Sequence, residues 1–204
     1  MLKAPVRNVV FDFGGVLVRW KPREVLERFY RDEARRTLAE RAVFQHPDWV
    51  ELDRGTLPEA AAVQRFAERM GRPPEELAAL VQHAKDSLTP IPESIELVRD
   101  LARRGIPLYG LSNASVETFA HLRDRYDFWT LLRGIVVSGE VRMVKPEPGI
   151  FEHLCRVHGL QPAETAFIDD LPPNVEAAAR LGFRTIRFTD ARACAAQLEG
   201  MLAP

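Results

Sequence analysis

The stretch that decides the fold is residues 9–16, which read Val9-Val10-Phe11-Asp12-Phe13-Gly14-Gly15-Val16. The apolar run indicates a buried strand, an aspartate follows at the strand end, and two glycines then allow a tight turn. In open parallel sheets, ligands bind outside the carboxyl ends of the strands. We therefore expect Asp12 to face a ligand site, where backbone N–H groups of the glycine turn can approach an anion.

Three later segments carry polar chemistry in a fixed order: Leu111-Ser112-Asn113, then Lys145-Pro146-Glu147-Pro148, then Phe167-Ile168-Asp169-Asp170. The first and third of these follow runs typical of buried strands, so one edge of a parallel sheet can bring them to Asp12. The adjacent carboxylates of Asp169 and Asp170 repel each other at a buried strand end unless a cation lies between them. Mg²⁺ prefers such oxygen ligands together with water and phosphate oxygens, so the sequence predicts a magnesium site.

Runs typical of strands occur near residues 8–12, 106–111, 135–138, 165–169 and 184–188, with helical patterns between them. This alternation predicts an α/β fold with a doubly wound, Rossmann-like parallel sheet. Residues 20–89 differ, because they contain no strand pattern. We expect them to form an inserted helical domain, and residues 1–19 and 90–204 to form the core domain.

Within the insert, residues 23–41 predict one long charged helix. Thr56-Leu57-Pro58-Glu59 has the pattern of a capping box that opens a second helix. The Pro73-Pro74 pair opens a third helix.

Composition narrows the function. The 204 residues carry a net charge of −1, which argues against nucleic acid or an anionic membrane as a partner. No apolar run approaches the roughly 18 residues that span a bilayer, and no signal-peptide pattern opens the sequence, so we expect a cytoplasmic protein. Cys155 and Cys194 lie in separate helical patterns, which favours free thiols. We expect a monomer or a homodimer.

The four segments together resemble the haloacid dehalogenase-like hydrolase superfamily, in its subfamily I with a helical cap, over nearly the whole chain. The resemblance implies an Mg²⁺-dependent phosphomonoesterase that hydrolyses a small phosphorylated metabolite through an aspartyl phosphate. It implies Asp12 as the nucleophile and Lys145 as the cation that offsets the charge of nucleophile and phosphate. The phosphate-binding residues that it implies are Gly14, Gly15, Ser112, Asn113 and Lys145.

The metal ligands implied by the resemblance are the Asp12 carboxylate, the Gly14 carbonyl and Asp170, with Asp169 bound directly or through water. Asn174 lies one helical turn beyond Asp170, and we expect it to orient that carboxylate without contacting the metal.

Gly14 departs from the pattern of most phosphatases in the family, which carry a second aspartate here in an Asp-x-Asp motif. The Asp-x-Gly variant resembles hexose-1-phosphate phosphatases and the phosphatase domain of soluble epoxide hydrolase. General acid catalysis contributes about 10²–10⁴-fold, so we expect substrates to rank by leaving-group acidity unless another group donates the proton. A cap residue, with His46 as the candidate, or a water can do so. Trp49 and Arg54 are candidate substrate contacts from the cap.

Two other functions remain open. In a metal-free 2-haloacid dehalogenase the same aspartate attacks carbon; that branch also lacks the second aspartate and carries Ser-Asn, but has no use for paired metal carboxylates. A binding protein without turnover on the same scaffold is favoured by Gly14. The presence of Asp12, Lys145 and the Asp169-Asp170 pair argues against it.

Overall fold

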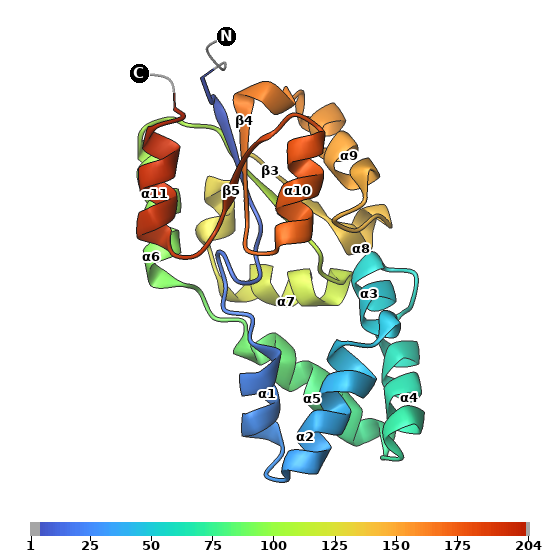
Figure 1. The fold of residues 1–204 in the computed structure, drawn as a ribbon. Helices are drawn as coiled ribbons and strands as arrows, with labels where there is room; N and C mark the ends of the chain where they lie inside the picture. The colour runs from blue at the N-terminus through green and yellow to red at the C-terminus, as the bar shows by residue number, and fades with distance from the viewer. Residues whose placement is uncertain (1–4, 203–204) are drawn as a thin grey trace.

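A five-stranded parallel sheet forms the centre of the computed structural model, which describes residues 5–202 (Figure 1). The strands are β1 (Asn8–Phe11), β2 (Leu108–Ser112), β3 (Gly134–Val137), β4 (Thr165–Asp169) and β5 (Arg184–Arg187). Their order is β3-β2-β1-β4-β5, and every neighbouring pair is parallel. The chain thus builds outward from β1 in one direction and then in the other, which confirms the predicted doubly wound fold. Such a reversal of strand order is where ligands bind.

Helices cover both faces of this sheet. They are α6 (Pro92–Arg103), α7 (Val116–Arg125), α8 (Ser138–Val141), α9 (Pro148–His158), α10 (Pro172–Arg180) and α11 (Ala191–Glu199), with short 3₁₀ turns η2 (Phe128–Leu131) and η3 (Pro162–Glu164). Because strand side chains alternate between faces, Val9 and Phe11 join one apolar cluster and Val10 joins another. This burial on both faces explains the continuous apolar run before Asp12.

The segment between β1 and α6 folds into a helical bundle, the cap. It contains α1 (Pro22–Phe29), α2 (Glu33–Ala39), the π-helical turn η1 (Glu40–Phe44), α3 (Pro47–Arg54), α4 (Glu59–Met70) and α5 (Pro74–Ser87). These elements share an apolar core of their own, which includes Val43, Phe66, Leu77 and Leu80. Figure 1 shows the bundle below the sheet, apart from the helices that flank the strands.

Two local predictions in the cap were wrong. The helix expected over residues 23–41 is broken, because Tyr30 is extended and the Asp32 side chain accepts a hydrogen bond from Arg35 N at 2.8 Å, which starts a new helix. The capping box is absent as well. Pro58 occupies the position before α4 without a side-chain cap, and the Thr56 hydroxyl instead donates to the Glu51 carbonyl at 3.2 Å.

Both cysteines are free, as predicted. Within residues 5–202, none of the helices combines the length and the apolar character needed to cross a membrane.

Candidate active site

Three carboxylates meet at the carboxyl edge of the sheet. Asp12 follows β1, Asp169 ends β4 and Asp170 follows it, and each offers an oxygen within 4.8 Å of the others. Gly14 lines the same cleft as Asp12 and Asp170. A cluster of three carboxylates has the oxygen chemistry that Mg²⁺ prefers, so the donor set fits this ion.

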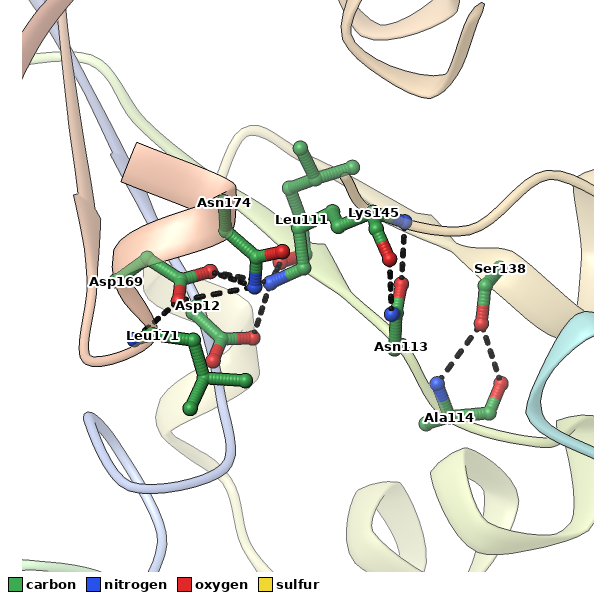
Figure 2. Close-up of polar contacts among 9 residues, drawn as sticks. All are labelled: Asp12, Leu111, Asn113, Ala114, Ser138, Lys145, Asp169, Leu171 and Asn174. Carbon is green, nitrogen blue, oxygen red and sulfur yellow. Dashed lines mark hydrogen bonds and ion pairs between the residues drawn. The ribbon is translucent and has the colours of Figure 1, made fainter. Parts of the chain in front are cut away.

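Lys145 lies buried among these acids (Figure 2). Its Nζ donates to Asp12 Oδ1 at 2.6 Å, to Asp169 Oδ2 at 2.7 Å and to the Leu111 carbonyl at 3.0 Å. Burial by itself lowers the pKa of the ammonium, but the two carboxylates outweigh that effect and raise it. Lys145 is therefore charged, and it holds one oxygen of Asp12 in place.

Burial has the opposite effect on the acids. It raises the pKa of Asp12, an effect that Lys145 opposes and Asp169 reinforces. Burial, followed by the charge of Asp169, also raises the pKa of Asp170. Asp12 and Asp170 are thus costly to ionise, which is the situation that a bound cation relieves.

Asn174, at the start of α10, bonds to Asp169 and not to Asp170, so the expectation for its partner was wrong. Its Nδ2 lies 3.0 Å from both Asp169 oxygens, and Leu171 N donates to Oδ1 at 2.9 Å (Figure 2). Asp169 is fully buried, and its carboxylate is enclosed by Lys145, Asn174 and the backbone of Leu171. Asp170 follows the strand end and lines the cleft.

The two phosphate-loop candidates on β2 have different surroundings. Ser112 is buried at the strand end. Both polar atoms of the Asn113 side chain bond to the backbone of Lys145, with Nδ2 donating to O at 2.9 Å and Oδ1 accepting from N at 2.8 Å (Figure 2). The Asn113 side chain therefore fixes the lysine loop, and one N–H of its amide remains without a partner among these two bonds.

Of the three cap candidates, Trp49 alone lines the cleft. It stacks on Trp20 with ring centroids 5.9 Å apart. Arg54 instead forms a forked ion pair with Glu147, at 2.9 and 2.8 Å, and ties the cap to the core. His46 caps α3, where its Nδ1 accepts a hydrogen bond from Asp48 N at 3.1 Å. The structure therefore places neither His46 nor Arg54 at the cleft.

Two adjoining cavities open between cap and core. The cleft, about 420 Å³, is lined by Asp12, Lys145 and Asp170. The recess, about 80 Å³, is lined by Ser112 and mostly by apolar side chains, which come from α3, α5, α7 and the loops beside them. Gly14 and Asp53 line both cavities.

Asp53 was not predicted as a site residue. Asp53 is half-buried at the cap–core boundary, where desolvation raises its pKa to about 8, while a hydrogen bond from the backbone of Ser115 opposes the rise. In the sequence, Asp53 cannot be told apart from Asp48 and Glu51 on the same helix. Only its place next to the Arg-Gly that ends α3 sets it apart.

Residues 6–182 match a family model described as haloacid dehalogenase-like hydrolase. A sesquiterpene phosphatase from Aspergillus oryzae is 28% identical over 96% of both chains. A drimenol cyclase from Aspergillus calidoustus is 29% identical over 90% of this chain but only 34% of its own length.

Solved structures share the fold. One is an enzyme of the same family from Bacteroides thetaiotaomicron, with a TM-score of 0.74 and 22% identity over 91% of this chain and 95% of that one. Another is the L-2-haloacid dehalogenase of Xanthobacter autotrophicus, with a TM-score of 0.68 and 22% identity over 98% of this chain and 85% of that one.

Proposed function

This chain belongs to the haloacid dehalogenase-like hydrolases, and we propose that it is an Mg²⁺-dependent phosphomonoesterase that forms a phosphoryl-aspartate at Asp12. The observation that carries the proposal is the buried Lys145 ammonium between Asp12 and Asp169, beside a third carboxylate on Asp170. A dehalogenase that attacks carbon needs the first aspartate but no cluster of three. The Bacteroides enzyme was solved with magnesium and inorganic phosphate, which supports the same reading.

In the proposed reaction an oxygen of Asp12 bonds to phosphorus while the bond from phosphorus to the ester oxygen breaks. Lys145 holds the nucleophile and offsets negative charge on the phosphoryl group. Backbone N–H groups of the glycine turn and of the loop after β2 bind the phosphoryl oxygens. Water then hydrolyses the phosphoryl-aspartate and frees Asp12.

Asp12, the Gly14 carbonyl and Asp170 would hold the magnesium ion, with Asp169 at its side. When bound, the ion neutralises charge on the phosphate and on this acidic cluster. Asn174 and Lys145 hold Asp169 in place through hydrogen bonds to its carboxylate.

The substrate class that the cavities favour is a phosphomonoester of a largely apolar alcohol. The phosphate fits the polar cleft, and the adjoining recess offers apolar side chains such as Leu52, Val81 and Ala84. A sugar would leave hydroxyl groups without partners against these side chains. The name of the Aspergillus oryzae relative, a sesquiterpene phosphatase, supports an apolar ester group over a hexose phosphate.

The test is hydrolysis of phenyl and alkyl phosphates with and without Mg²⁺, by wild type and by Asp12→Asn. We expect Mg²⁺-dependent release of phosphate by wild type. The amide cannot attack phosphorus, so turnover should fall by at least about 10³-fold. The melting temperature of the variant should stay close to that of wild type.

Asp124→Asn, which changes an exposed aspartate of α7, is the matched control and should keep wild-type rates. Turnover by Asp12→Asn above about a tenth of wild type, or activity unaffected by removal of the metal, would contradict the proposal.

A further inference from the structure

Asp53 and Gly14 line the same two cavities, one from the cap and the other from the core. Gly14 provides no side chain to protonate a departing alcohol. We propose that the Asp53 carboxyl is the general acid of the reaction and donates the proton that no side chain at position 14 can supply. This inference rests on the proposed phosphatase function.

The end of α3 that carries Asp53 is fastened to the core. The Ser138 hydroxyl lies 2.6 Å from the Asp53 carbonyl and accepts a hydrogen bond from Ala114 N at 2.9 Å. Gly55 packs so closely on Gly139 that an added Cβ would lie 2.3 Å from the Gly139 carbonyl oxygen. Asp53 is therefore held against the loop after β2, where phosphate is expected to bind.

The backbone N–H of Ser115 donates to the Asp53 carboxyl and favours the carboxylate, but the rest of the surroundings favour the protonated form. Of the cations that line the two cavities, Lys145 is paired with Asp12 and Asp169, and Lys85 is paired with Glu59 at 2.9 Å. Arg54, which follows Asp53 in the chain, is paired with Glu147. Asp12 and Asp170 line the cleft and carry negative charge, which favours the neutral form of Asp53. The third acid nearby, Glu140 of α8, is exposed to solvent.

The pKa of about 8 that burial gives Asp53 agrees with this geometry. A general acid must hold its proton at the working pH and release it as the leaving group departs. His46, the donor expected from the sequence, does not line either cavity within the described residues.

The step balances in both halves of the reaction. As Asp12 bonds to phosphorus and the ester P–O bond breaks, the proton of Asp53 passes to the leaving oxygen, which departs as the alcohol. Asp53 is then a carboxylate. It takes a proton from the water that attacks the phosphoryl-aspartate, which releases phosphate and restores both aspartates.

This assignment changes the expected substrate ranking. With Asp53 in place, wild type should depend only weakly on leaving-group acidity. In Asp53→Asn the amide cannot donate in this way. Hydrolysis of alkyl phosphates should then fall by about 10²–10⁴-fold, whereas 4-nitrophenyl phosphate, whose leaving group needs no proton, should keep a rate close to wild type.

The experiment compares kcat/KM for a series of aryl and alkyl phosphates in wild type, Asp53→Asn and Glu51→Gln. Glu51 is an exposed acid two residues earlier on α3, and its variant should match wild type on every substrate. The 4-nitrophenyl rate shows that Asp53→Asn is folded and competent. A loss equal across the series, or a wild type already steep in leaving-group acidity, would overturn the proposal.

An infrared difference spectrum of the metal-free protein at neutral pH, wild type minus Asp53→Asn, gives a readout without turnover. It should contain the C=O stretch of a protonated carboxyl. A carboxylate band instead would also overturn the proposal. Absence of any phosphate ester hydrolysis by wild type would instead refute the proposed function itself.

Discussion

Gly14 and Gly15 are neighbours, but glycine is needed at these positions for different reasons. Gly15 has φ of +80°, and a Cβ there would lie 2.5 Å from Asp170 Oδ2, so the backbone itself requires glycine. Gly14 does not have a positive φ, and a Cβ there would meet Trp20 Cβ at 3.4 Å, an ordinary contact. The backbone at position 14 thus admits a Cβ and does not by itself require glycine. Its absence leaves space in both cavities.

The stability of the protein should depend on pH through Asp53. Its pKa rises from 3.8 to about 8 on folding, so between these values the folded state holds a proton that the unfolded chain has lost. The free energy of unfolding of wild type must then fall as pH rises through that window. Asp53→Asn, which has no such proton, should be more stable than wild type at pH 7.5, and the gap should close near pH 4.

Urea unfolding of the two proteins across this pH range measures the difference. A gap that stayed constant from pH 4 to pH 8 would show that Asp53 is ionised in the folded protein. The same measurement on Glu51→Gln controls for loss of an acid on α3.

At the scale of elements, α3 connects the cap to the candidate active site. Its first turn is anchored inside the cap by Asp48, which accepts from Arg65 at 3.1 Å and pairs with Arg69 at 2.5 Å. Its last turn is anchored to the core through Asp53, Arg54 and Gly55. We therefore expect this one short helix to determine how the cap is positioned relative to the candidate active site.

A comparison of Gly55→Ala with Gly71→Ala separates the effect of the contact between α3 and the core from the effect of backbone strain. Both glycines end cap helices with positive φ, 76° and 60°, so each alanine should cost about 1–2 kcal/mol. Only at Gly55 does the new methyl group collide with the core, because nothing lies within 4 Å at Gly71.

We expect Gly71→Ala to keep its activity and Gly55→Ala to lose about 10²-fold in kcat/KM, since α3 must shift. Rates and melting temperatures of both variants check this. Equal activity in the two variants would show that the contact with Gly139 does not position the site.

At the scale of the whole molecule, the substrate cavities belong to neither half alone. The recess combines Val18 and Leu122 from the core with Leu52, Val81 and Ala84 from the cap. These side chains also belong to the apolar cluster of their own half, so an ester group in the recess would contact both clusters.

Ala84→Leu should fill the recess. Extra volume in an apolar pocket changes specificity by about 10-fold or more, so kcat/KM for decyl phosphate should fall by that factor while phenyl phosphate changes little. Ala79→Leu, on the exposed face of the same helix, is the control and should behave as wild type. An equal loss on both substrates would argue against an apolar ester group in the recess.

The sequence by itself determined the sheet, its two-way winding and the meeting of Asp12, Asp169 and Asp170, because apolar strand runs and the residues that end each run are local patterns. Tertiary structure alone decided which partners the polar groups found. Asn174 turned to Asp169 and Asn113 to the backbone of Lys145.

The cap shows the same division. The spacing of its apolar residues predicts its helices. The position of Asp53, however, depends on Ser138, 85 residues further along the chain. Arg54 likewise depends on Glu147, 93 residues away. A contact between two such distant residues leaves no mark in the local pattern of either, since it exists only once both halves have folded and docked. That is why four motifs predicted a nucleophile, whereas the proposed acid became visible only in the folded molecule.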